Sequence, residues 1–269
     1  MKIIKSFKIL KDRINHIKNI GFVPTMGSLH NGHLSLIKKA KIKSQKVLVS
    51  IFVNPSQFNE RKDFIKYPRN IRNDISKLEK LKVDYLFLPS NTEIYKSGIK
   101  RKINIQKEDK ILCAKYRRGH FQGVLAVMDR FLKNIPAKYV FLGEKDYQQF
   151  FLIKKYLNKK YSCEIISCKT IRNKNKLPLS SRNVYLSKIN LKKSEKISQL
   201  IFNFRKNILK KFNKISLLNK YRTKIKYLCD NLEYFEIRNS KNLSKNISKK
   251  NFRIFIAYRQ NNIRLIDNI

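Results

Sequence analysis

The 269-residue sequence contains no tryptophan and has only seven glycines, six prolines, four cysteines and four histidines. No two cysteines form a CxxC pair, so we expect reduced structural thiols rather than disulfides or a zinc site. There is no internal repeat and no linker rich in Gly, Ser and Pro. Because hydrophobic residues still make up 42% of the chain, the composition favours a globular protein over a disordered or fibrous one.

Long hydrophobic runs are also missing. Apolar segments such as VLVSIFV (47–53) have the length of a strand and fall far short of the roughly 18 residues that a membrane-spanning helix needs. The first 22 residues contain no uninterrupted hydrophobic region and no small-residue cleavage site of a secretory signal. We therefore expect a cytoplasmic protein that does not associate with a membrane.

Acidic residues are scarce. The 18 Asp and Glu residues stand against 62 Lys and Arg residues, for a formal net charge of +44. A basic surface can bind nucleic acid by gathering phosphates and releasing counterions. However, the lysines are spread along the whole chain, and Lys, Asn, Ile, Phe and Tyr, which A/T-rich codons encode, are over-used together. We therefore attribute the charge to codon bias and expect no specific nucleic-acid partner.

Strand-length apolar segments alternate with amphipathic segments over the first 170 residues. The pattern predicts strands at 20–24, 47–53, 83–89, 137–143 and 163–168, and helices at 2–18, 31–43, 70–81, 120–135 and 146–158. This alternation is typical of an α/β protein, here a Rossmann-like parallel sheet with helices on both faces. Sites in such sheets lie beyond the carboxyl ends of the strands, which here means residues 24–33, 54–58, 143–149 and the stretch after 171.

The composition changes after about residue 185, where Lys/Asn-rich helices are followed by two short strands near 233–238 and 252–258. We interpret this part as a smaller C-terminal α+β domain. The predicted division is therefore a Rossmann-like domain at 1–170 and a smaller domain at 171–269.

Two of the four histidines lie in GFVPTMGSLHNGH (21–33), at a predicted strand-to-helix junction. His30 and His33 are spaced i, i+3 at the start of the helix, so both project to one side, beside free backbone N–H groups and the positive end of the helix dipole. Gly27 and Gly32 would let a phosphate approach the main chain. Two neutral imidazoles can donate hydrogen bonds to such a phosphate. The alternative interpretation is a pair of surface histidines at a helix cap.

Two further segments offer groups that bind phosphates. In GEKDYQQ (143–149), Lys145 could hold a phosphate, and Asp146 could cap the following helix or orient a neighbour. LSSRN (179–183) presents two hydroxyls and the Arg182 guanidinium in succession. That set suits a pyrophosphate leaving group, although a simple turn can have the same composition.

Gln57, in VNPSQF (53–58), and Gln149 carry neutral amides that can bind hydroxyls and a carboxylate. In chain order, the HxGH junction, NPSQF, YPR, GHFQGV, GEKDYQQ and LSSRN resemble the pantothenate synthetase (pantoate–β-alanine ligase) family of the nucleotidylyltransferase superfamily. The motifs keep the order and spacing of that family. The resemblance extends to RLIDN (264–268), nearly the whole chain.

The resemblance implies a two-step reaction. The carboxylate of pantoate attacks the α-phosphorus of ATP, giving pantoyl adenylate and pyrophosphate, and the amine of β-alanine then attacks the acyl carbon, giving pantothenate and AMP. Mg²⁺ should accompany ATP through phosphate oxygens and water, with no protein residue assigned as a metal ligand and no tightly bound cofactor. The family also implies a homodimer formed through the N-terminal domain and a smaller domain that closes over the ATP site.

The resemblance assigns residues as well. His33 matches the residue usually taken as general acid, and His30 and Lys145 would contact the phosphates. The residues that match the ATP-binding segments are Met26, Gly27, Ser28, Leu29, His30, Asn31, Gly32, His33, Gly143, Glu144, Lys145, Asp146, Ile171, Leu179, Ser180, Ser181 and Arg182. Ile171 would contact adenine through its backbone, and Gln57 and Gln149 would bind pantoate.

The sequence departs from the family pattern in three places. LCAKYRR (112–118) replaces an LEGxxRP pattern, NKLP (175–178) replaces DGLA, and Asn73 replaces one acid of a pair that leaves Asp74. A lysine in place of the glycine, and the proline that follows, should stiffen the second of these loops. The changes bear on the speed of loop closure and on the magnesium environment, and they leave the nucleotide and pantoate contacts in place.

Other functions fit parts of the pattern. Another HxGH nucleotidylyltransferase would adenylate a phosphate, but a phosphate acceptor calls for cations where Gln57 and Gln149 stand. An aminoacyl-tRNA synthetase shares the HxGH junction, but 269 residues leave little room for an anticodon-binding domain. A basic nucleic-acid-binding protein without catalysis would show steeply salt-dependent binding and no dependence on pantoate.

Overall fold

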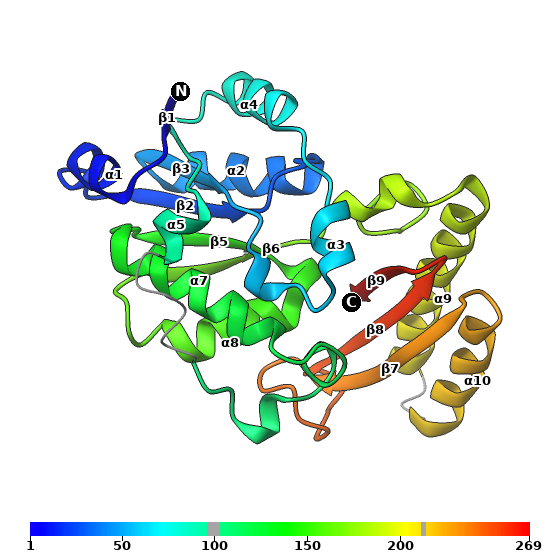
Figure 1. Cartoon of the computed structure of the whole chain (residues 1–269). Helices are drawn as coiled ribbons and strands as arrows, with labels where there is room; N and C mark the ends of the chain where they lie inside the picture. The colour runs from blue at the N-terminus through cyan, green and yellow to red at the C-terminus, as the bar shows by residue number, and fades with distance from the viewer. Residues whose placement is uncertain (96–102, 211–213) are drawn as a thin grey trace. The chain divides into compact units, whose positions relative to one another are not determined.

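The structure is a computed structural model of the chain and describes residues 1–95, 103–210 and 214–269. It consists of two compact units, Met1–Lys169 and Thr170–Ile269 (Figure 1). The division falls next to the boundary predicted after residue 170.

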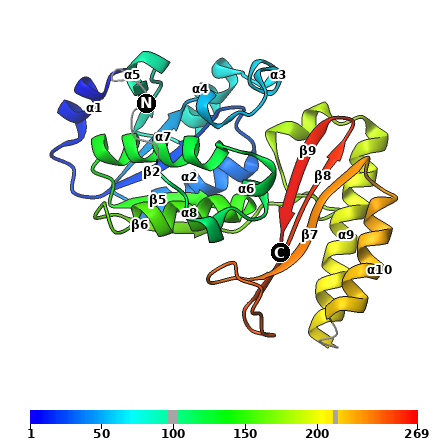
Figure 2. The same ribbon diagram turned by 60° about the horizontal axis from the view of Figure 1, so that its bottom comes forward.

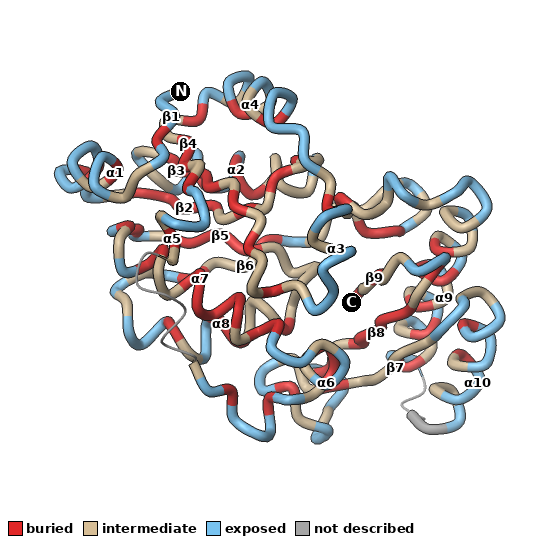
Figure 3. Tube along the Cα trace, viewed as in Figure 1, coloured by how far each residue is buried: buried red, intermediate tan, exposed pale blue. Residues whose placement is uncertain are grey.

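The first unit is built on a parallel sheet. Within the described residues its strands follow the order β1 (Lys2–Ile4), β4 (Tyr85–Phe87), β3 (Lys46–Ile51), β2 (Ile20–Thr25), β5 (Tyr139–Gly143) and β6 (Glu164–Cys168). Each strand pairs with its neighbours in parallel, which confirms the predicted fold class. The central strands are apolar runs buried on both faces, as Figure 3 shows for β2 and β3.

The order of the strands reverses in the middle of this sheet. β2 pairs with β3 on one side and with β5 on the other, so the connections that leave β2 and β5 run in opposite directions. In parallel sheets, ligands bind beyond the carboxyl ends of the strands at such a switch point. The segment after β2 carries His30 and His33, and the segment after β5 carries Lys145. The topology therefore brings these two distant segments to one place.

Helices cover both faces of the sheet (Figure 1). The helices described in this unit are α1 (Phe7–Ile14), α2 (Asn31–Lys43), η1 (Pro55–Gln57), α3 (Arg61–Lys66), α4 (Ile71–Lys80), α5 (Asn91–Tyr95), η2 (Lys107–Asp109), α6 (Cys113–Tyr116), α7 (His120–Asn134), η3 (Glu144–Asp146) and α8 (Tyr147–Leu157). Phe22 and Val23 are adjacent in β2 and point to opposite faces. Val23 packs in one core with Ile37 of α2 and Leu78 of α4. Phe22 meets Phe131 of α7 on the other face, with 5.4 Å between ring centroids.

The N-terminal segment differs from its prediction. Residues 2–18 were expected to form one helix, but Lys2–Ile4 form edge strand β1, paired with β4, and the helix spans only Phe7–Ile14. Ser6 fixes the start of α1, because its hydroxyl accepts a hydrogen bond from the backbone N–H of Lys8. The strand is missed because its apolar residues also fit the helical period, whereas its pairing partner is about 80 residues away.

The second unit contains η4 (Ser181–Tyr185), α9 (Lys188–Lys210), α10 (Lys214–Lys226) and an antiparallel sheet of β7 (Asn231–Asn239), β8 (Phe252–Gln260) and β9 (Ile263–Asn268). Figure 2 shows α9 and α10 beside each other along this sheet, and a core of aliphatic and aromatic side chains joins the two layers. This agrees with the predicted α+β class. Strand β9 was not predicted. Asn261 and Asn262, both with positive φ, form the tight hairpin turn that precedes it, and this pair is a turn signal present in the sequence.

Among the described residues, no helix combines the length and the apolar character that crossing a bilayer requires.

Candidate active site

His30 and His33 form a reciprocal capping box at the N-terminus of α2. The backbone N–H of Gly32 donates to Nδ1 of His30 at 3.1 Å, and the backbone N–H of His30 donates to Nδ1 of His33 at 3.3 Å. The two ring centroids lie 4.1 Å apart. Because both Nδ1 atoms accept hydrogen bonds, each neutral ring carries its proton on Nε2. The cap thus leaves each imidazole with one N–H donor for a ligand.

Both imidazoles are neutral at physiological pH. Burial lowers the pKa of His30 to about 4, helped by the positive charges of Lys145 and Lys77. Burial, followed by the neighbouring His30, lowers the pKa of His33 to about 3. In the site without ligand, His33 is therefore a neutral hydrogen-bond donor rather than an imidazolium.

We expect His30 and His33 to remain neutral at pH 5, where a histidine with the ordinary pKa of about 6.5 is mostly protonated. Since the folded pKa values lie below that of the unfolded chain, the unfolded state binds more protons, and these residues make the free energy of unfolding fall as the pH drops below about 6.5. Histidine ¹⁵N NMR at pH 7 and pH 5 should show the Nε2–H tautomer at both. An imidazolium signal from either ring at pH 5 would contradict the assignment.

Gly32 is required by the histidine pair itself. A Cβ atom at this position would lie 2.7 Å from Cε1 of His30 and would displace the ring. The sequence suggested that both glycines give a phosphate access to the main chain. The structure adds a conformational reason for Gly27, whose φ of 79° is a left-handed conformation that glycine adopts without strain.

Helix α4 holds the loop between β2 and α2. The Asp74 carboxylate, only 1% exposed, accepts hydrogen bonds from the backbone N–H groups of Ser28 (2.8 Å) and Leu29 (2.7 Å). Nζ of Lys77, one turn further along α4, donates to the carbonyl oxygen of Leu29 at 2.6 Å. Sequence reasoning placed Asp74 in the magnesium environment and missed this role. The signal that could have found it is an acid within the apolar stripe of that helix, because Asp74 falls between Ile71 and Leu78 at helical spacing.

We expect Asp74→Ala to lower the free energy of unfolding by about 3 kcal/mol, because it leaves two buried N–H groups without their charged acceptor. Urea unfolding of the variant and the wild type measures the difference. Asp12→Ala, at an exposed position of α1, is the matched control and should change little. A loss below about 1 kcal/mol would show that the carboxylate does not hold the loop.

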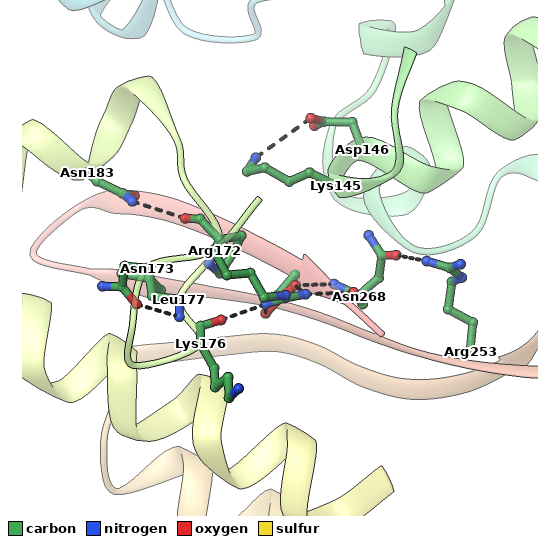
Figure 4. Close-up of polar contacts among 11 residues, drawn as sticks. Lys145, Asp146, Arg172, Asn173, Lys176, Leu177, Asn183, Arg253 and Asn268 are labelled. Atoms are coloured by element: carbon green, nitrogen blue, oxygen red, sulfur yellow. Dashed lines mark hydrogen bonds and ion pairs between the residues drawn. The ribbon is translucent and has the colours of Figure 1, made fainter. Parts of the chain in front are cut away.

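The segment after β5 adds a cation to the site. Lys145 lies in η3, close enough to both histidines to lower their pKa values, and its Nζ lies 3.7 Å from the Asp146 carboxylate (Figure 4). Asp146 occupies the N-cap position of α8 but makes no side-chain capping bond. Of its two predicted uses, the cap is wrong, and the ion pair with Lys145 fits the second. Glu144 accepts a hydrogen bond from the Ser167 hydroxyl on β6.

Gln57 lies beside the histidine loop. Its side-chain amide donates to the sulfur of Met26, and the residue is 8% exposed. Its backbone carbonyl is held by the His120 ring (Nδ1, 2.7 Å) and by the Arg117 guanidinium (3.2 Å). Arg117 of the altered stretch LCAKYRR and His120 of GHFQGV therefore fix the position of Gln57.

The two adjacent glutamines of α8 differ in their surroundings. Gln148 is buried, and its amide binds the N–H of Cys113 and the carbonyl oxygen of Ile111. Gln149 is partly exposed. Gln148 thus anchors the 111–113 segment to the helix, which leaves Gln149 as the glutamine suited to a substrate.

Comparison with known proteins decides the family. The family model of pantoate-beta-alanine ligase matches residues 2–269. The chain belongs to the pantoate–β-alanine ligase family. The pantothenate synthetase of Francisella tularensis subsp. mediasiatica (strain FSC147) is 40% identical over 267 residues, covering 98% of this chain and 94% of that protein. The chain is thus a ligase of pantothenate biosynthesis that binds ATP.

Solved structures agree with this family. Pantothenate synthetase from Thermus thermophilus superimposes with a TM-score of 0.91 at 30% identity, over 100% of this chain and 99% of that one. Pantoate-beta-alanine ligase from Francisella tularensis, complexed with beta-gamma ATP and beta-alanine, gives 0.86 at 39% identity, over 100% and 97% of the two chains.

The remaining ligase motif lies in the second unit. The Leu179 N–H donates to the carbonyl oxygen of Ile171 at 2.9 Å, which joins the segment that would meet adenine to the start of the LSSRN motif. Ser180 caps η4, because its hydroxyl accepts a hydrogen bond from the Arg182 N–H, and Ser181 is buried. The structure therefore collects the predicted residues into two groups, one in each unit.

Proposed function

We propose that this ligase joins pantoate to β-alanine through a pantoyl-adenylate intermediate. A carboxylate oxygen of pantoate attacks the α-phosphorus of ATP, and the bond from that phosphorus to the pyrophosphate oxygen breaks. The amine of β-alanine then attacks the acyl carbon, AMP leaves with the bridging oxygen, and the amine loses a proton. No protein side chain forms a covalent bond, so catalysis rests on positioning and charge stabilisation.

The observation that carries this proposal is the pair of neutral Nε2–H donors at the N-terminus of α2, with the Lys145 ammonium nearby. Charge develops on phosphate oxygens in the first step, and preorganised N–H donors stabilise it without reorganisation. His30, His33 and Lys145 would bind the phosphates of ATP. The Francisella relative, crystallised with beta-gamma ATP and beta-alanine, supports the same substrates here.

Two glutamines would bind pantoate. The backbone carbonyl of Gln57 is held by a hydrogen bond from the His120 ring, and its side-chain amide lies beside Met26 of the histidine loop. Gln149 lies in the first turn of α8, shortly after Lys145. Neutral amides can bind the hydroxyls of pantoate and orient its carboxylate without adding a charge that would compete with the phosphates.

Mg²⁺ would enter with ATP and neutralise part of the phosphate charge. The residues that the structure describes include no group of three or more His, Cys, Asp or Glu side chains that could hold a metal ion. Both oxygens of Asp74 are engaged by backbone N–H groups, and the Asp146 side chain is about half-exposed. This donor set fits an ion held mainly by phosphate oxygens and water, with Asp146 as the available carboxylate.

The proposal also includes a homodimer and a second unit, Thr170–Ile269, whose LSSRN motif would bind phosphates of ATP. Both features are carried over from the family. Sedimentation equilibrium of the purified chain would test the dimer.

Exchange of labelled pyrophosphate into ATP, with Mg²⁺ and without β-alanine, tests the intermediate. Exchange that requires pantoate supports the adenylate, and adding β-alanine should then release pantothenate and AMP in equal amounts. Product formation without any pantoate-dependent exchange would overturn the two-step route. A folded protein that forms no product, and that binds RNA with a steep salt dependence, would favour the basic-protein alternative.

A further inference from the structure

The loop that precedes the LSSRN motif contains a left-handed backbone conformation, which favours glycine, at a residue that is not glycine. Asn175 and Lys176 stand where the family pattern has Asp and Gly, and Lys176 has a φ of 73°. A non-glycine residue in this left-handed conformation costs about 1–2 kcal/mol. Lys176 therefore has a strained conformation, and other contacts must hold the loop.

Glu195, on the first turns of α9, supplies such contacts. Its Oε1 accepts a hydrogen bond from Nδ2 of Asn173 at 2.7 Å, and its Oε2 accepts one from Nδ2 of Asn175 at 2.8 Å. All three side chains are partly buried. A carboxylate can serve both amides at once because it has two acceptor oxygens.

Asn175 and Glu195 are matched in chemistry. The asparagine amide can donate a hydrogen bond, whereas an aspartate, the residue of the family pattern, has no donor at neutral pH and would repel the glutamate. The Asp-to-Asn change therefore creates a bond that the family's own residue could not make to Glu195. In this chain, Asn175, which departs from the DGLA pattern, therefore has a hydrogen-bond partner on α9, Glu195.

The Asn173 side chain transmits this contact to the backbone. While its Nδ2 binds Glu195, its Oδ1 accepts the N–H groups of Asn175 and Leu177, each at 3.0 Å. Figure 4 shows the bond between Asn173 and Leu177. The N–H of Lys176 also donates to the carbonyl oxygen of Asn173 at 3.0 Å. The orientation of one asparagine amide, set by Glu195, thus determines the turn at Lys176.

Arg172 holds the opposite side of the same loop. Its guanidinium makes two hydrogen bonds of 2.7 Å to the Asp267 carboxylate and another of 2.7 Å to the carbonyl oxygen of Lys176 (Figure 4). It also lies 5.0 Å from the ring centre of Phe202, two turns after Glu195 on α9. One face of α9 and the end of β9 therefore enclose the loop that leads into Leu179.

We propose that Glu195 is a positioning residue for ATP: through Asn173 and Asn175 it holds the 172–178 loop, and thereby the Leu179–Arg182 segment, in the shape that binds phosphates. The inference rests on the proposed function, because it assumes that Leu179–Arg182 contacts ATP. It adds to that function a residue of α9, outside every motif that marks the family in this sequence.

Steady-state kinetics and hydrogen exchange of the full-length chain test this role. Glu195→Ala should raise KM for ATP about tenfold, the loss of roughly one charged hydrogen bond, while KM for pantoate and for β-alanine change by less than about twofold. Exchange of backbone amides in 173–177 should become faster. Gln199→Ala, exposed one turn further along α9, is the matched control and should change neither quantity.

Exchanging the charges at positions 175 and 195 tests whether their direct contact affects ATP binding, as distinct from a general loss of stability. Asn175→Asp places two carboxylates together and should raise KM for ATP. The double variant Asn175→Asp/Glu195→Lys replaces that repulsion with an ion pair and should recover part of the increase, but not all of it, because a lysine cannot accept the bond from Asn173. Failure of the double variant to improve on Asn175→Asp would overturn the proposed pairing.

The variant Arg182→Ala separates the role of Glu195 from the proposed function on which that role rests. If it raises KM for ATP while Glu195→Ala does not, the role of Glu195 is wrong and the proposed function stands. If Arg182→Ala leaves KM for ATP unchanged, the phosphate assignment itself fails and the role of Glu195 falls with it.

Discussion

His33→Ala should lower the rate of pantoate-dependent pyrophosphate exchange by about 10²–10³-fold, while the protein stays folded. The substitution removes one of two preorganised Nε2–H donors that we propose stabilise the developing phosphate charge. It also removes one bond of the α2 cap, which should cost only about 1 kcal/mol of the free energy of unfolding. Exchange kinetics together with thermal unfolding measure both effects.

The neutral state of the His33 ring makes a second variant informative. With a pKa of about 3, the ring acts as a neutral donor, and the amide of Gln can also donate a hydrogen bond. His33→Gln should therefore recover part of the rate that His33→Ala loses. His16→Ala, at an exposed position outside the site, is the control for the loss of a histidine. Near-wild-type exchange in His33→Ala would contradict the role assigned to this ring.

Gly123→Ala should raise KM for pantoate at least tenfold and lower the free energy of unfolding by about 1–3 kcal/mol. In the structure α7 packs directly on η1, and a Cβ atom at residue 123 would lie 2.3 Å from the carbonyl oxygen of Ser56 and 2.9 Å from the backbone nitrogen of Gln57. Neither backbone atom can swing aside as a side chain could, so η1 must move and carry Gln57 with it.

The effect should be specific to the pantoate side of the site. The Asn54 amide bonds to the carbonyl oxygen of Gly123 at 3.1 Å, so the shift would loosen both ends of η1, whereas the histidine loop is held separately by Asp74. KM for ATP should therefore change much less than KM for pantoate in initial-rate measurements. Lys133→Ala, exposed on the same helix, is the matched control. Equal changes in both KM values would show that the damage is general.

The alternating apolar pattern was sufficient to predict the parallel sheet. Strands such as Lys46–Ile51 are apolar runs of the right length, and the helices between them have clear periods, so local sequence determines them. The segments that contain η1, α3, α5 and α6 have no such period and were not predicted as helices. Their short helices exist because of tertiary contacts, such as those of η1 with α7, that lie outside any sequence window.

The candidate site likewise has residues that could be predicted from the sequence and residues that could not. His30, His33, Lys145, Gln57 and Gln149 could be chosen from sequence because chemically distinctive residues recur in a fixed order. Their supports could not be chosen in that way. Asp74 is an acid within an apolar helical stripe and Glu195 is the single acid of α9, and neither has an evident partner until the fold shows which N–H groups they meet.

By itself, then, the sequence determined the fold class, the order of the main strands and helices and the chemical groups proposed to meet the substrates, because periodicity and motifs are local properties of the chain. Only the tertiary structure decided that Asp74 of α4 holds the histidine loop, that burial and Lys145 keep both imidazoles neutral, and that the His120 ring holds the backbone carbonyl of Gln57. These facts depend on distances between atoms far apart in the chain. Such distances are set by packing and hydrogen bonding between elements and not by any one of them.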